Sequence, residues 1–234
     1  MIDRDLQAPF TVPEGAIEII LIRHGSSCAA TGMPQIDGHA NPPLSRLGIE
    51  QAAAVAHRLR ALDPERTDLF VTSLQRTAQT AEPTADALGA VPTVIADLRE
   101  VCLGDYEGEE YEKRRQADDM LLMRVFEKER WDLLPGAEDT DAFRARVRRG
   151  LATTLNTVPA GSTAVAFVHG GVVAEICRWI TGSRPFAFVD VENGSITRIV
   201  HHADRSFRLR TFNDTSHLGL AARSVSQLRP AHPG

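Results

Sequence analysis

The stretch EIILIRHGSSCAATG, residues 18–32, joins a run of apolar residues to an arginine, a histidine and a glycine. An apolar run without polar alternation favours a strand that is buried on both faces, as in the parallel sheets of α/β proteins. The glycine after the histidine permits a tight turn where the strand ends. The sequence therefore predicts a central strand at 16–22 that places Arg23 and His24 at its carboxyl end.

The same design occurs a second time, in TAVAFVHGG at residues 163–171. A continuous apolar strand again delivers a histidine, His169, and two glycines into a turn before a helical pattern, GVVAEICRWI. Between these stretches, short β-rich runs alternate with helical patterns, which is typical of a layered α/β domain. Both histidines should then lie at strand ends, where open α/β sheets bind ligands.

Hydrophobic spacing and turn residues place the remaining elements. Ser45 can cap a helix at 45–62, and an inward stripe of that helix is expected from Leu47, Ala54, Val55 and Leu59. Pro83 is expected to kink or divide a helix at 74–88. We expect a charged helical insertion at about 106–133, a helix at 139–158, a turn at Asn193-Gly194, and strands at 68–73, 92–98, 186–191, 195–204 and 207–214.

The totals bound the function classes. With 234 residues and 43% hydrophobic composition, one α/β domain with a substantial core is expected. A net charge of -5 gives no broad basic field for nucleic acid, so an anion site must be local. Three widely spaced cysteines suit a reducing, cytoplasmic location, and no run of about 18 apolar residues indicates a membrane span. Residues 1–15 are expected to form a flexible arm and residues 219–234 a tail.

Four residues after three separate strands could converge on one tetrahedral anion: Arg23, His24, Arg76 and His169. A guanidinium is permanently charged, and beside a buried strand end it calls for an anion. Each residue alone has a plainer interpretation. A histidine after a strand is often structural, Arg23 can form an internal salt bridge, and Arg76 can be an exposed helix charge.

Ordered motifs give these residues a specific resemblance. The chain resembles the histidine phosphatase superfamily, in its phosphoglycerate-mutase-like branch, over about residues 16–218, in LIRHG, NPPLSRLGIEQA, VTSLQRTAQTAE, LREVCLGDYEG, LPGAEDTDAFRARV, VHGG and NDTSHL. The resemblance implies a three-layer α/β/α sandwich with a mixed, mostly parallel central sheet. It also implies phosphoryl transfer through a phosphohistidine, with no metal or other cofactor, and it leaves a homodimer open.

The resemblance also assigns roles. His24 matches the nucleophile, whose neutral ring attacks phosphorus, and Arg23, Arg76 and His169 match the phosphate pocket. Glu100 occupies the acid/base position, whereas Asp105 and Glu107 are expected to shape the loop or bind backbone. Gly170 and Gly171 should bring backbone N–H groups close to the phosphate, and the hydroxyl of Ser26 or Ser27 could donate to it.

Departures from the family concern the loop after the first histidine. The Trp-Asn pair of many members is absent from RHGSSCAATG, and Cys28 is interpreted as an entrance residue or a small packed hydrophobe. We therefore expect a metal-independent phosphomonoesterase that acts on a small phosphorylated metabolite. Its selectivity should reside in residues 106–133 and in the loop 26–42.

Other interpretations remain. A phosphoglycerate mutase would use the same pocket, and the basic tract at 113–115 could meet an acidic substrate, although such a cluster is usually a solvated helix face. A catalytically weak phosphate-binding regulatory protein would keep the pocket without turnover. A serine hydrolase is disfavoured because Ala29 replaces the final glycine of its elbow, and a zinc site at His201-His202 because adjacent strand residues point to opposite faces.

Overall fold

A mixed six-stranded sheet forms the centre of the molecule in the computed structural model, which describes residues 10–30 and 35–219. The strand order is β5-β4-β6-β1-β7-β8. Parallel pairing joins β5 (Thr93–Val94), β4 (Thr67–Val71), β6 (Thr163–Val168) and β1 (Ile17–Arg23), and antiparallel pairing adds β7 (Ile196–His201) and β8 (Phe207–Asp214). The expected mixed, mostly parallel sheet is confirmed.

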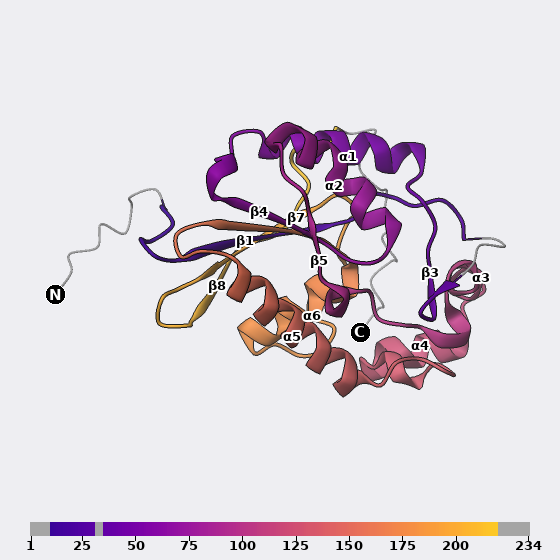
Figure 1. The fold of residues 1–234 in the computed structure, drawn as a ribbon. Helices are drawn as coiled ribbons and strands as arrows, with labels where there is room; N and C mark the ends of the chain where they lie inside the picture. Colours follow the sequence, from indigo (N-terminus) through magenta and orange to yellow (C-terminus); the bar gives the residue numbers. More distant parts are fainter. Residues whose placement is uncertain (1–9, 31–34, 220–234) are drawn as a thin grey trace.

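Helices cover both faces of this sheet (Figure 1). One face carries α1 (Arg46–Leu59) and α2 (Gln75–Leu88), and the other carries α5 (Thr140–Thr157) and α6 (Gly170–Thr181). Alternate residues of β1 enter the two cores, with Ile20 and Ile22 on the α1–α2 side and Ile19 and Leu21 on the other. This double burial explains why the strand is apolar from Ile19 to Ile22, and the helices on both faces confirm the three-layer sandwich.

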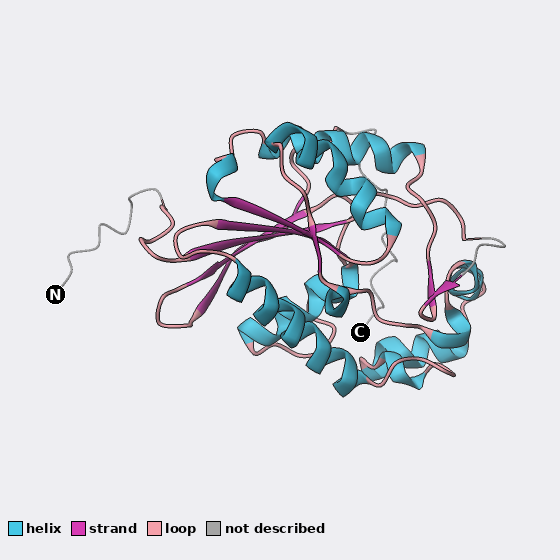
Figure 2. Cartoon of the chain, in the orientation of Figure 1, coloured by secondary structure: helices cyan, strands magenta, loops and turns pink. Residues whose placement is uncertain are grey.

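Two short helices, α3 (Glu109–Gln116) and α4 (Met120–Lys128), occupy the expected insertion beyond the sheet (Figure 2). They share a small core of their own, formed by Tyr106, Leu122, Val125 and Leu134. A separate hairpin of β2 (Gln35–Ile36) and β3 (His39–Ala40) lies near α3. The insertion and the hairpin therefore stand at the same end of the molecule.

Helix α2 is continuous through Pro83, so the proline does not divide it, and its buried stripe packs on the sheet on both sides of the proline. Two expectations about local structure are wrong. The strand expected at 92–98 ends at Val94, since the chain turns into a 3-10 helix that buries Leu98. The strand expected at 186–191 is a loop, in which Phe186 packs on Trp131 and Phe188 on Phe212.

Other local expectations hold. The Ser45 side chain accepts from the Gly48 N–H and caps α1, on which Val55 and Leu59 are buried as expected, while Leu47 and Ala54 are only partly covered. The chain turns at Asn193-Gly194. Most of the expected arm at 1–15 and nearly all of the expected tail at 219–234 lie outside the described residues.

Candidate active site

The two histidines lie side by side because β1 and β6 are neighbouring parallel strands. Arg23 pairs in register with Val168, so the residues that follow, His24 and His169, leave the sheet at the same edge. The two imidazole rings meet edge to face, with centroids 5.2 Å apart. The expected convergence of the two strand ends is therefore present in the structure.

The hydrogen bonds of His24 define which ring nitrogen carries the proton and which carries the lone pair. Nδ1 lies 2.8 Å from the carbonyl oxygen of Gly25, and the Nε of Arg76 donates to Nε2 over 3.1 Å. We assign the ring proton to Nδ1, because only a protonated nitrogen can bind a carbonyl and only a lone pair can accept from a guanidinium. The lone pair therefore sits on Nε2.

Burial and positive neighbours keep this ring neutral. Only 6% of His24 is exposed, and burial lowers the pKa of the imidazole well below its ordinary value, with Arg76 and Arg23 lowering it further. A neutral ring is the form that a nucleophilic histidine needs.

The turn after His24 is held by close backbone contacts. A Cβ on Gly25 would lie 2.5 Å from the carbonyl oxygen of Gly48, so only glycine fits there. The N–H of Gly25 donates to Thr80 Oγ1 over 3.0 Å, and the side chain of Asn193 donates to the His24 carbonyl over 2.9 Å. His24 is thus fixed from α1, α2 and the turn before β7.

His169 is bound differently. Its Nε2 lies 2.9 Å from the hydroxyl oxygen of Thr72, and its Nδ1 is buried with no hydrogen-bond partner among the described residues. The Thr72 hydroxyl also lies 3.1 Å from the Thr77 hydroxyl, which donates to the Leu74 carbonyl over 2.8 Å. Two neighbours, Thr77 Oγ1 and His169 Nε2, can therefore accept the Thr72 proton. In the tautomer in which Thr72 donates to His169 Nε2, the ring proton lies on Nδ1, where it can be donated to a bound anion.

Burial also keeps His169 neutral in the substrate-free protein. The ring is fully buried, and desolvation lowers its pKa well below the ordinary value, with Arg76 and His24 as further causes. Neither ring therefore adds a formal positive charge to the site, and its cationic character comes from the arginines.

Two buried guanidinium groups flank the histidines. Arg76 is 8% exposed and also donates to the Ala40 carbonyl over 2.9 Å. Arg23 donates from Nη1 to the Val191 carbonyl, and its buried Nε has no hydrogen-bond partner within the described chain. Burial lowers the pKa of both groups, while attraction to Glu100 raises it. Buried cations with a spare donor require an anion, and a phosphoryl group supplies three oxygens.

Glu100 is anchored at the start of α6. Its carboxylate accepts from the Gly171 N–H, at 3.0 and 3.2 Å, and from its own neighbour Val101 N–H over 3.0 Å. A Cβ on Gly171 would lie 2.5 Å from Oε1, so the glycine makes room for the carboxylate. Its attraction to Arg23 and Arg76 places this group within electrostatic reach of both. A carboxyl group held there can serve a proton transfer.

The glycine and serine candidates mainly serve local packing in the structure. A Cβ on Gly170 would lie 3.4 Å from Arg23 Nε, so this residue leaves room for the guanidinium. The Ser26 N–H donates to Gln51 Oε1 over 2.8 Å, and its carbonyl accepts from the Ser45 N–H over 2.8 Å. A hydroxyl contact between Ser26 and phosphate stays a prediction. Cys28 is exposed rather than packed.

The loop acids and the basic tract behave as structural residues. Glu107 accepts from the backbone N–H groups of Ala40 and Leu103, as expected for a loop-shaping residue. The basic tract faces solvent and pairs within α3, through Lys113–Glu109, Arg114–Glu110 and Arg115–Glu112. This pairing agrees with a solvated helix face.

Two other features, a metal cluster and a membrane-spanning helix, are absent from the described residues. No group of three metal-binding side chains occurs in residues 10–30 and 35–219. Over the same residues, no helix has the length and apolarity needed to cross a membrane.

Sequence reasoning missed three residues that hold the site. Thr72 binds His169, while His39 and Arg146 bind the Glu100 carbonyl. Thr72 lies four residues before Arg76 in the motif VTSLQRTAQTAE, so its position in that motif could have marked it as a site residue. Nothing in the sequence connects His39 to Glu100.

Comparisons with known proteins agree with this geometry. The family model of the histidine phosphatase superfamily (branch 1) matches residues 19–215. A probable phosphoglycerate mutase, GpmB, of Yersinia enterocolitica is 26% identical over 212 residues, which cover 88% of this chain and 97% of that protein.

Two solved structures share the fold. A phosphoglycerate mutase from Bacillus anthracis superposes with a TM-score of 0.70 at 19% identity, covering 87% of this chain and 96% of the other. A mycobacterial glucosyl-3-phosphoglycerate phosphatase superposes with a TM-score of 0.70 at 24% identity, covering 86% and 100%. With the model match spanning most of its length, the chain belongs to the histidine phosphatase superfamily, branch 1.

Proposed function

We propose that this protein is a phosphomonoesterase that hydrolyses a small phosphorylated metabolite through a phosphohistidine on His24, without a required metal. The observation that carries the proposal is the hydrogen bonding of His24. Its Nδ1 is tied to the Gly25 carbonyl, so the lone pair of Nε2 faces the guanidinium of Arg76. A phosphoryl group bound by Arg76 would thereby meet the nucleophilic nitrogen.

In the first step the Nε2 lone pair forms a bond to phosphorus while the bond to the ester oxygen breaks. Glu100, in its acid form, gives a proton to the departing oxygen. Arg23 Nε and His169 Nδ1, which are both buried without a hydrogen-bond partner among the described residues, would donate to the non-bridging oxygens. These contacts stabilise charge that shifts between oxygens in the transition state.

In the second step the Glu100 carboxylate takes a proton from water as the water oxygen attacks phosphorus. The phosphorus–nitrogen bond breaks and returns its electron pair to Nε2, which regenerates the neutral ring. Phosphate leaves, and Glu100 is again in its acid form. One carboxyl group therefore serves both steps.

The mutase alternative follows from the name of the curated relatives. A mutase would pass the phosphoryl group back to the bound organic product instead of to water. Recognition of a phosphoglycerate carboxylate needs a free cation, and the basic tract at 113–115 is instead paired with glutamates of its own helix. The tract is therefore a solvated helix face and gives no support to a mutase.

The test is phosphate release from sugar phosphates, phosphoglycerates, nucleotides and an aryl phosphate, with chelator present, in wild type and His24→Ala. His24-dependent release from at least one substrate is expected, with a ranking among them. Interconversion of phosphoglycerates without phosphate release would show a mutase. The absence of both activities would show a phosphate-binding protein without turnover.

A further inference from the structure

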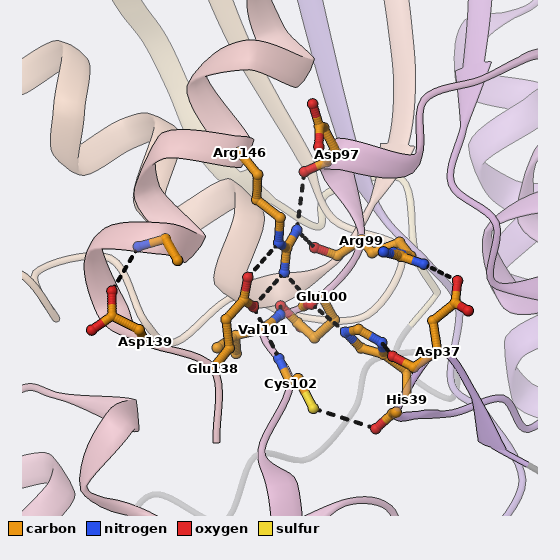
Figure 3. A network of polar contacts seen from close by, with 12 residues as sticks. Asp37, His39, Asp97, Arg99, Glu100, Val101, Cys102, Glu138, Asp139 and Arg146 are labelled. Carbon is orange, nitrogen blue, oxygen red and sulfur yellow. Dashed lines mark hydrogen bonds and ion pairs between the residues drawn. The ribbon is translucent and has the colours of Figure 1, made fainter. Parts of the chain in front are cut away.

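The main-chain oxygen of Glu100 is held by two side chains from distant parts of the chain. His39 Nε2 lies 2.8 Å from it, and Arg146 Nη2 donates to it over 2.7 Å (Figure 3). A carbonyl oxygen has two lone pairs, so these two contacts use its accepting capacity. The carboxylate of the same residue is held separately, by the Gly171 and Val101 N–H groups. Glu100 is thus fixed at both its backbone and its side chain.

All the N–H donors of Arg146 are used in contacts with Glu138 and the segment at 97–100. Helix α5 buries it to 8% exposure, and its guanidinium makes five hydrogen bonds, to both carboxylate oxygens of Glu138 and to the carbonyl oxygens of Asp97, Arg99 and Glu100. A guanidinium has five N–H donors, so none remains for a substrate. Arg146 therefore shapes the path of the chain through Glu100 rather than binding phosphate.

His39 reaches Glu100 from the β2–β3 hairpin. It is 5% exposed, and its other ring nitrogen, Nδ1, lies 2.9 Å from the Asp37 carbonyl. A neutral ring has a single N–H, and we assign it to Nε2, which then donates to the Glu100 carbonyl. The Asp37 carboxylate pairs with Arg99, the residue before Glu100. Two adjacent contacts therefore fasten the hairpin to the segment at 99–100 (Figure 3).

The same hairpin also contacts Arg76, the arginine that we propose binds the phosphoryl group. Ala40, next to His39, accepts from Arg76 Nη1 through its carbonyl and donates its N–H to Glu107. The hairpin thus lies between Arg76, which contacts the nucleophile, and Glu100. A shift of the hairpin would move the two groups relative to each other.

We propose that His39 and Arg146 are positioning residues that act through Glu100, by holding its main-chain oxygen so that the carboxyl group meets the departing ester oxygen. This inference rests on the proposed role of Glu100 as acid and base. Small displacements matter because a shift of about 1 Å away from the reacting geometry can cost about 100-fold in rate.

His39→Phe is the first variant, because it fills a similar volume but donates no hydrogen bond. We expect kcat/KM, which reports the step in which the ester oxygen departs, to fall about 10-fold for an alkyl phosphate, whose leaving oxygen needs a proton, with a change under about 2-fold for an aryl phosphate. His39→Gln keeps an N–H donor and should recover most of the loss. His57→Phe, at an exposed histidine on α1, is the matched control and should leave both rates unchanged.

The decisive measurement is a double-mutant cycle with Glu100→Gln. If His39 acts through Glu100, adding His39→Phe to Glu100→Gln should change the alkyl phosphate rate by less than about 2-fold. Independent, multiplying losses would overturn the inference, as would an equal loss on alkyl and aryl substrates. Thermal unfolding of each variant separates this effect from misfolding, and Arg146→Lys, which keeps the charge without the fork, should show the same substrate dependence.

The same data separate the two proposals. A Glu100→Gln variant that loses equally on both substrates removes Glu100 from the acid role, and the positioning inference falls with it. A Glu100→Gln variant with the expected leaving-group dependence, beside a His39→Phe variant without it, keeps the acid and overturns the positioning role alone.

Discussion

The two strand ends that build the site share a sequence design but differ in their hydrogen bonds. Both β1 and β6 contain a buried apolar run, and each strand is followed directly by a histidine and a glycine. His24 binds a carbonyl through Nδ1 and offers Nε2, whereas His169 binds the Thr72 hydroxyl through Nε2 and offers Nδ1. The strand and the glycine place each imidazole, and the hydrogen bond of one ring nitrogen determines which nitrogen faces the site. In the proposed mechanism this difference makes His24 the group that attacks phosphorus and His169 the group that donates to it.

The largest effect that would test this difference is expected from His24→Ala. Without its nucleophile the protein should lose at least about 1,000-fold in kcat, because the remaining groups only bind and orient the substrate. His169→Gln keeps an N–H donor and should lose less. Steady-state phosphate release measures both, with thermal unfolding of each variant as the control for folding. Similar losses in the two variants would contradict the proposal that His24 attacks phosphorus while His169 only donates a hydrogen bond.

The next effect concerns Arg76, which donates a hydrogen bond to the ring of His24. Arg76→Ala removes the guanidinium beside His24 Nε2 and should lower kcat/KM by about 100-fold or more. Arg46→Ala, at a side chain that is 94% exposed on α1, is the control and should have no effect. Undiminished turnover in Arg76→Ala would exclude this residue from the phosphate pocket.

A smaller effect tests the bond that distinguishes His169. Thr72→Val keeps the shape of the side chain but frees the ring to place its proton on either nitrogen, so a loss of about 10-fold in kcat is expected. Thr84→Val is the matched control, because the buried Thr84 hydroxyl has no hydrogen-bond partner among the described residues. If both variants kept full activity, the tautomer of His169 would not depend on Thr72.

The smallest effect is on stability and concerns both rings together. Burial depresses the pKa of each histidine, so below about pH 6.5 the unfolded chain takes up protons that the folded protein refuses. Unfolding free energy should therefore fall as the pH falls, by roughly 1 kcal/mol per ring at pH 6. Urea unfolding at pH 8 and pH 6 measures this loss of unfolding free energy. His24→Ala removes one of the two rings and should therefore reduce the loss by the contribution of that ring. A flat profile would show that the rings are not held neutral.

Much of this arrangement follows from the sequence. The apolar runs before His24 and His169 predict buried neighbouring strands, and glycine after each histidine predicts the turns. Motif resemblance then selects Arg23, Arg76 and Glu100 from many charged residues. These features are readable because a strand end and its next residue are set by local pattern.

The parts that could not be predicted depend on contacts between distant segments. His39 lies 61 residues from Glu100 and Arg146 lies 46 residues from it, and no periodicity encodes such a meeting. The expected strand at 186–191 fails for the same reason, because Phe186 and Phe188 pack on aromatic partners elsewhere in the fold. Tertiary contacts overrode local β propensity there.

The most direct test of the account is to find where the phosphoryl group is carried. A substrate labelled with radioactive phosphorus would be mixed with the protein and quenched in base within the first turnover, since phosphohistidine is labile in acid. We predict label on Nε2 of His24, retained in His169→Gln and absent from His24→Ala. Label on His169, or turnover by His24→Ala at the wild-type rate, would contradict the assignment of the two histidines.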